Sequence, residues 1–141
     1  MKYVLDANIA AKWVLPEPDS AKALALRNER RSNVHIFVAP DIFPVEVGHA
    51  FTRAERQGRI SQPESANFWA DVMMTAPILT PYIPLMLRAL ALSSQARIGV
   101  YDCLYVALAE REACDFVSAD DRLVRNIKPY FPFIVSLNSM P

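Results

Sequence analysis

The chain has 141 residues, a hydrophobic content of 52% and a formal net charge of zero at pH 7. This length suits one domain with an ordinary core, and the composition is typical of a globular protein rather than a disordered one. Because the net charge is zero, bulk positive charge is excluded as the main attraction for a nucleic acid. A polyanion would have to be held by local basic patches or by a bound cation.

Short apolar runs typical of strands alternate with segments of helical periodicity. In chain order we predict strand 2–5, helix 7–15, helix 20–31, strand 34–39, helix 41–56, helix 62–75, strand 78–80, helix 83–95, helix 101–114, strand 115–118, helix 121–127 and strand 133–137. This alternation predicts an α/β domain with a mostly parallel sheet and right-handed crossovers. No internal repeat or linker is evident, so we expect a single domain over residues 1–141.

Local signals mark several helix ends. Asp41 is a predicted cap, and Pro44 then falls at the third helical position, where a missing N–H costs little. Gly58 follows the helix that ends at residue 56 and suits a helix terminus. Ser61 with Glu64 forms a predicted capping box for the next helix.

The cysteines and the N-terminus bear on the compartment. Cys103 and Cys114 fall on one predicted helix, about 16 Å apart at a rise of ~1.5 Å per residue, which is too far for a disulfide. Reduced thiols without a CxxC pair are typical of the cytoplasm. No secretory signal follows Lys2, and the uncharged stretch 72–87 is short and interrupted by prolines. We therefore expect a cytoplasmic protein that does not enter a membrane.

Three aspartates stand at the ends of predicted elements. Asp6 ends the first strand, Asp120 follows the fourth, and Asp102 opens the helix before the fourth strand. Taken singly, each is typical of a helix cap. In a parallel sheet, however, residues just after the strand C-termini converge on one edge, where ligands bind. We therefore expect these aspartates to lie close together.

Glu46 in FPVEVGHAF is a fourth acid, on a helix with apolar residues around most of its circumference. An unpaired carboxylate in such a setting costs several kcal/mol unless something compensates it. A salt bridge to Arg53, or an exposed position, is the alternative to a place in a site. About one turn into the helix after the second strand, Glu46 is expected near the same sheet edge as the aspartates.

Four carboxylates at one sheet edge would repel one another, so a cation is the natural compensator. Oxygen ligands without Cys or His favour Mg²⁺ or Mn²⁺ over zinc. Such a site is suited to activating water and to stabilising charge on a phosphoryl centre.

Four segments carry a resemblance to a known family: VLDANIAAKWVLPE, PDIFPVEVGHAF, VYDCLYVALAE and FVSADDRLV. In this order they resemble the four acidic motifs of PIN-domain ribonucleases, and their spacing resembles the bacterial VapC toxins of toxin–antitoxin pairs. The resemblance implies one PIN domain, an α/β/α sandwich whose sheet of four to five strands has the order 3-2-1-4-5. It also implies a metal-dependent ribonuclease that cleaves RNA, forms homodimers and is inhibited by an antitoxin that blocks the acidic groove.

The same resemblance assigns catalytic and metal-binding roles to four residues, namely Asp6, Glu46, Asp102 and Asp120. Asn8 matches the polar residue that orders the site, and Ser118 matches a residue that supports the last acid. Asp120 and Asp121 form a doublet. We place Asp120 at the metal because it lies nearest the strand end, and Asp121 as a cap or a water-mediated ligand.

Some alternatives stay open at this stage. The arginines of residues 27–31 and 53–59 either bind RNA phosphates or form a solvated face with local ion pairs to Glu29 and Glu55. Tyr105 is assigned to the core or to an interface.

A non-catalytic protein-interaction module of the PIN fold is the alternative function, although the intact acid set argues against it. A phosphotransfer enzyme is disfavoured because DAN lacks a DxD arrangement.

Overall fold

The computed structural model describes residues 1–141. Five strands form one all-parallel sheet in the order β3-β2-β1-β4-β5, which confirms the order that the resemblance implies. The strands are β1 (Lys2–Leu5), β2 (Ile36–Pro40), β3 (Ile78–Thr80), β4 (Asp115–Ser118) and β5 (Ile134–Ser136). The α-helices are α1 (Ala7–Ala11), α2 (Ser20–Arg31), α3 (Phe43–Arg56), α4 (Gln62–Met73), α5 (Met86–Ala96), α6 (Val100–Glu112) and α7 (Asp121–Ile127).

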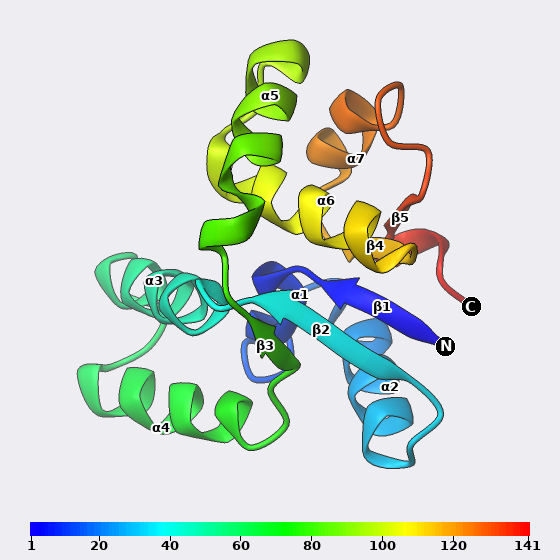
Figure 1. Ribbon diagram of the computed structural model, residues 1–141. Helices are drawn as coiled ribbons and strands as arrows, with labels where there is room; N and C mark the ends of the chain where they lie inside the picture. The colour runs from blue at the N-terminus through cyan, green and yellow to red at the C-terminus, as the bar shows by residue number, and fades with distance from the viewer.

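Helices cover both faces of the sheet, as expected for an α/β/α sandwich. α6 packs across β1, β2 and β4, and α5 packs against α6. Figure 1 shows α5 and α6 on one side of β1 and β2, and α2 on the other. The antiparallel pair of α3 and α4 extends beyond β2 (Figure 1). None of the helices is both long enough and apolar enough to span a membrane.

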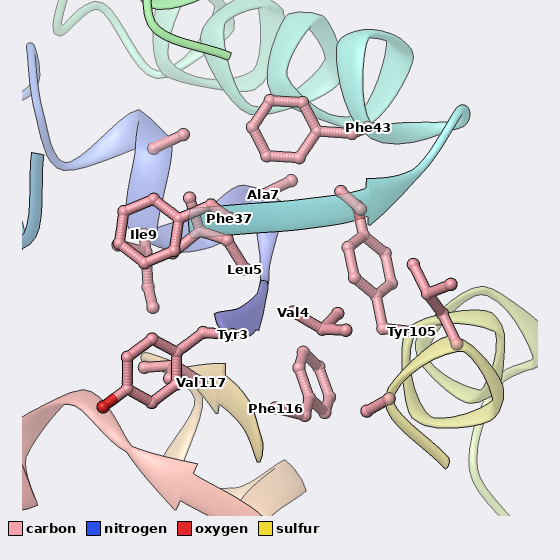
Figure 2. Close-up of a cluster of buried hydrophobic side chains, with 14 of the residues drawn as sticks. Tyr3, Val4, Leu5, Ala7, Ile9, Phe37, Phe43, Tyr105, Phe116 and Val117 are labelled. Atoms are coloured by element: carbon pink, nitrogen blue, oxygen red, sulfur yellow. The ribbon is translucent and has the colours of Figure 1, made fainter. Parts of the chain in front are cut away.

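The core lies around β1, the central strand. Val4 and Leu5 are completely buried, which explains why this strand is a continuous apolar run. Tyr105 of α6 stacks on Phe116 of β4 with 5.7 Å between the ring centres. Figure 2 shows this tyrosine pointing from α6 toward the strands, among the side chains of the core. The core therefore reaches the side of the sheet that α6 covers.

Several predicted helix ends are confirmed. Gly58 has a φ of 73°, a left-handed conformation that favours glycine after a helix. The Ser61–Glu64 capping box is present in both directions, with hydrogen bonds of 3.3 and 2.9 Å. The predicted bounds of α2 and α7 match the structure.

Other boundaries were wrong. The helix predicted over 7–15 ends at Ala11, because residues 12–15 form turns. Asp41 does not cap α3; its carboxylate instead accepts a hydrogen bond from the backbone N–H of Tyr82 at 3.0 Å. The helix predicted over 83–95 begins as a 3₁₀ turn, η1 (Ile83–Leu85), and continues as α5.

The two cysteines do not share a helix. α6 ends at Glu112, and Ala113 adopts a left-handed conformation with a φ of 51° as the chain turns into β4. Cys114 therefore lies beyond the helix. Both Cys103 and Cys114 are free thiols, as predicted.

Candidate acidic site at the carboxyl edge of the sheet

Asp6 occupies the edge of the sheet where β1 ends. It caps α1, because its carboxylate accepts a hydrogen bond from the backbone N–H of Asn8 at 3.4 Å. The side chain is nevertheless buried, and its second oxygen accepts a 2.8 Å hydrogen bond from the Ser118 hydroxyl. The register pairs Leu5 with Val117, so Asp6, which follows β1, lies beside Ser118 of β4. Asp6 is thus a cap and also part of a buried polar network.

Asn8 and Ser118 connect the ends of β1 and β4. The Asn8 amide donates to the Ser118 hydroxyl oxygen at 3.3 Å, and its carbonyl oxygen accepts from the backbone N–H of Ala119 at 3.1 Å. The Ser118 oxygen also accepts from the backbone N–H of Asp120 at 3.1 Å. One hydroxyl therefore holds Asp6, Asn8 and Asp120 together, because it donates one hydrogen bond and accepts two.

The structure separates the two members of the aspartate doublet. Asp120 caps α7 through one oxygen, which accepts from the backbone N–H groups of Arg122 and Leu123, both at 3.1 Å. The Asp121 carboxylate instead accepts hydrogen bonds from the side chains of Ser136 and Asn138, at the end of β5. Asp120 is the member that interacts electrostatically with the other acids.

Glu46 and Tyr105 form an unusual buried pair. One carboxylate oxygen of Glu46, Oε1, and the hydroxyl of Tyr105 are both buried without a hydrogen bond of normal geometry. Burial raises the pKa of Glu46, the nearby Tyr105 hydroxyl opposes this rise, and the charge of Asp102 adds to it. Glu46 makes no ion pair with Arg53, so that alternative is wrong.

The pKa shifts of three of these acids include the charge of another acid among their causes. Burial raises the pKa of Asp6 to about 7, and the charges of Asp102 and Glu46 add to the effect, while the Ser118 hydrogen bond opposes it. Burial also raises the pKa of Asp102, and the charge of Asp120 adds to it. Asp102 lies in the first turn of α6, whose cap is Gly99, so it is not a helix cap. The roles assigned to these four acids stay predictions, and their pairwise charge interactions agree with a common edge of the sheet.

The donor set fits a hard divalent cation. All the donors are carboxylate oxygens. Burial and the repulsion between these carboxylates disfavour their charged forms, and a bound positive charge would offset both effects. One oxygen of Glu46 is buried without a hydrogen-bond partner. The side chains are not gathered as tightly as bound ligands, since no group of three or more His, Cys, Asp or Glu side chains has the geometry of a metal centre.

Basic residues line two cavities beside these acids. A cavity of ≈ 320 Å³ adjoins Asn8 and Asp120, and its lining includes Lys12, Arg53 and Arg59. A second cavity, of ≈ 210 Å³, lies beside Asp102 and Asp120 and is lined by Arg97, Ile98, Arg122, Leu123 and Asn126.

Sequence reasoning missed Lys12, Arg97, Arg122 and the role of the Tyr105 hydroxyl. No local pattern distinguishes these residues from ordinary surface or core positions.

Arg27 is buried, so neither of the two alternatives for the arginines of residues 27–31, RNA contact or a solvated face, holds for this residue. Its side chain is 5% exposed and bonds Asp71 at 3.0 Å and the Thr75 hydroxyl at 2.7 Å. The guanidinium also lies 4.8 Å from the centre of the Trp13 ring. Arg27 therefore ties α2 to the end of α4.

Comparison with known proteins agrees with this geometry. A family model for the PIN domain matches residues 3–128. The chain belongs to the PIN domain family. This PIN domain is 27% identical over 138 residues to ribonuclease VapC3 from Pyrobaculum aerophilum, covering 96% of this chain and 99% of the relative.

Two crystal structures share the fold. PAE2754 from Pyrobaculum aerophilum aligns with a TM-score of 0.69 at 18% identity, covering 99% of this chain and 94% of the other. VapBC2 from Rickettsia felis, bound to a DNA fragment from their promoter, aligns with a TM-score of 0.61 at 14% identity, covering 96% and 97%. At these identities the two structures support the fold of this PIN domain.

Proposed function

We propose that this protein is a metal-dependent endoribonuclease that hydrolyses RNA phosphodiester bonds and acts as the toxin of a toxin–antitoxin pair. The observation that carries the proposal is the pairwise charge interaction that links Asp6, Glu46, Asp102 and Asp120, in a chain that aligns over 96% of its length with a ribonuclease. We take residues 1–141 as one PIN domain, because a single hydrophobic cluster extends from Tyr3 to Leu137.

The cofactor we propose is Mg²⁺ or Mn²⁺, held by the same four acids. When bound, the cation supplies an activated water and stabilises negative charge at the phosphoryl centre. The protein orients its carboxylates through hydrogen bonds. Ser118 fixes one oxygen of Asp6, and the Asn8 amide holds the Ser118 oxygen in place. The α7 backbone fixes one oxygen of Asp120 and leaves the other without a hydrogen bond.

The partners we propose are an RNA substrate, a VapB-like antitoxin and a second copy of this chain. The structural relative named VapBC2 supports the antitoxin.

Exposed apolar side chains on and beside α5 support a homodimer, since Ile83 is 71% and Leu87 84% exposed. Replacing Leu87 by Glu is expected to convert a dimer to a monomer in light scattering; an unchanged mass would place the interface elsewhere. The free thiols favour a cytoplasmic location.

The test is cleavage of RNA with Mn²⁺. We expect the wild-type protein to cleave, and Asp6→Asn or Asp102→Asn to lose at least about a hundredfold in rate because a charged ligand is removed. Asp115→Asn is the matched control, since Asp115 is at the opposite end of β4. Equal cleavage by the wild type and both variants would show that the assigned site is wrong.

The aspartate doublet has its own test. Asp120→Asn is expected to reduce cleavage as strongly as Asp6→Asn, whereas Asp121→Asn is expected to lower stability through its lost bonds to Ser136 and Asn138. A stronger loss of cleavage in folded Asp121→Asn than in Asp120→Asn would reverse this assignment.

A non-catalytic interaction module is the second candidate. One observation favours it, because no three acidic side chains are gathered in the geometry of a metal centre. If titration of the purified protein shows no Mn²⁺ binding at millimolar concentrations, the module becomes the better account.

A further inference from the structure

The cavity beside Asn8 and Asp120 has a distinctive wall. Lys12 is the C-cap of α1, Arg53 lies on α3, and Arg59 follows α3, so cations from three segments meet around one hollow of ≈ 320 Å³. We call this hollow the basic pocket. It shares Asp120 with the acidic site, so a chain crossing the acids would pass it directly.

The charges of the basic pocket are only partly compensated. Glu17 pairs with the Lys12 ammonium at 3.3 Å and approaches the Arg59 guanidinium at 4.0 Å. The Arg53 guanidinium makes no ion pair. Three cations face Glu17 and Asp120, which leaves a formal excess of one positive charge in a chain of zero net charge. This excess matches one phosphodiester anion.

The uncharged part of the lining also favours a phosphate over a base. No aromatic side chain lines the pocket, so there is no platform on which a base could stack. The apolar part consists of Ala11, Leu15, Ala50 and Ala119, and Asn8 and Gln57 contribute amide groups.

We propose that the basic pocket binds a backbone phosphate of the RNA next to the one at the acids, with Arg53 as the free contact. Glu17 holds Lys12 and Arg59 in place as the pocket wall. This inference rests on the proposed ribonuclease function and adds the path of the substrate. The contact carries no sequence information, because it is made to the backbone.

Arg56 provides a matched control for Arg53. Both lie on α3 within one turn and both are exposed, but Arg56 does not line the pocket. The experiment uses Asp102→Asn protein, so that RNA is not consumed, and follows the fluorescence anisotropy of a labelled single-stranded RNA at several salt concentrations. Arg53→Ala, Arg53→Lys and Arg56→Ala are each introduced into the Asp102→Asn protein. The affinity of each double variant for two RNAs of unrelated sequence is compared with that of Asp102→Asn alone.

We expect Arg53→Ala to weaken binding of both RNAs about tenfold at low salt. The slope of log affinity against log salt should fall by about 0.7, the value for one phosphate contact on a single strand. Arg53→Lys should keep the slope, and Arg56→Ala should change the affinity less than twofold. Circular dichroism should show equal melting temperatures, because the Arg53 side chain is exposed and makes no ion pair.

Two results would overturn the inference: an unchanged slope in Arg53→Ala, or equal losses in Arg53→Ala and Arg56→Ala. If Arg53→Ala lost antitoxin binding but kept its affinity for RNA, the pocket would belong to a protein partner, and the inference would also be wrong. Cleavage by the wild-type chain is measured separately. Absence of cleavage would therefore count against the proposed function, whereas the slope tests the basic pocket.

Discussion

Asp6 is a buried carboxylate whose surroundings disfavour its charge. The fold removes it from water, places the charges of Asp102 and Glu46 within electrostatic range, and offers two donors, the Ser118 hydroxyl and the backbone N–H of Asn8. The balance favours the protonated form, with a pKa of about 7. The folded protein therefore binds a proton at Asp6 more tightly than the unfolded chain does.

A dependence of stability on pH follows for the metal-free protein. Between pH 3.8 and about 7 the folded state holds the Asp6 proton and the unfolded state loses it, so stability falls as pH rises. Above pH 7 Asp6→Asn should be more stable than the wild type by on the order of 1–4 kcal/mol, and near pH 4 the two should be equal. Urea unfolding in EDTA at both pH values measures the difference. A difference that does not grow with pH would contradict the burial of Asp6.

Tyr105 is expected to act on Glu46 through its hydroxyl. Because that group opposes the rise in the Glu46 pKa, Tyr105→Phe should raise this pKa further. The hydroxyl has no hydrogen bond of normal geometry, so the change in stability should be within about 1 kcal/mol. Carbon-13 NMR titration of the Glu46 carboxyl measures the shift, with Tyr130→Phe as the control. A lower Glu46 pKa in Tyr105→Phe would show that the hydroxyl does not favour the carboxylate.

At the scale of elements, one buried arginine joins two helices on the sheet's periphery. Arg27 of α2 donates to the backbone carbonyl and the carboxylate of Asp71, and to the hydroxyl of Thr75 just after α4. Trp13 covers the guanidinium and donates its own N–H to Ala23 at 3.0 Å. These contacts satisfy a buried cation that would otherwise be costly.

Removing this connection should destabilise the protein without altering the acids. Arg27→Ala is expected to cost about 2–4 kcal/mol, because it removes the hydrogen bonds to Asp71 and Thr75 and opens a hole beside Trp13. Arg31→Ala, at an exposed position on the same helix, should change stability by less than ~0.5 kcal/mol. Denaturant unfolding of the two variants gives the comparison. Similar losses in both would mean that the buried contacts of Arg27 contribute little.

At the scale of the whole molecule, the sheet brings acids from distant parts of the chain to one edge. The Ser118 hydroxyl donates to Asp6, 112 residues away in sequence, at 2.8 Å and accepts from the backbone N–H of Asp120 at 3.1 Å, so it links two of these acids. Without a metal, repulsion between these acids destabilises the folded state. A bound cation should therefore stabilise the entire domain.

Thermal unfolding is the corresponding measurement. Mn²⁺ at a hundred times its dissociation constant should add about 2.7 kcal/mol, or roughly 5–10 °C in melting temperature. The gain should be larger at pH 8 than at pH 5, because protons compete for Asp6. Asp102→Asn should lose most of the gain and Asp115→Asn should keep it. Equal gains in both variants would indicate a cation site elsewhere.

Local patterns predicted much of the fold because they act over few residues. Apolar runs identified the strands, and Ser61 with Glu64 identified a helix start, since each depends on neighbours within one turn or one strand. Asp41 and Arg27 were misread because their partners lie far away in sequence. Tyr82 is 41 residues from Asp41, and Asp71 is 44 from Arg27. A cap pattern or a charged helix face does not reveal such partners.

The sequence by itself determined that acids follow buried strands at one sheet edge, because strand polarity and a parallel topology are enough to bring them there. Only the tertiary structure decided which acid of the doublet faces the others, which arginine of α3 enters the basic pocket, and which tyrosine approaches Glu46. These choices depend on side-chain directions and on contacts between distant segments. Asp6 illustrates both parts: its position follows from β1, and its raised pKa follows from burial beside α6 and β4.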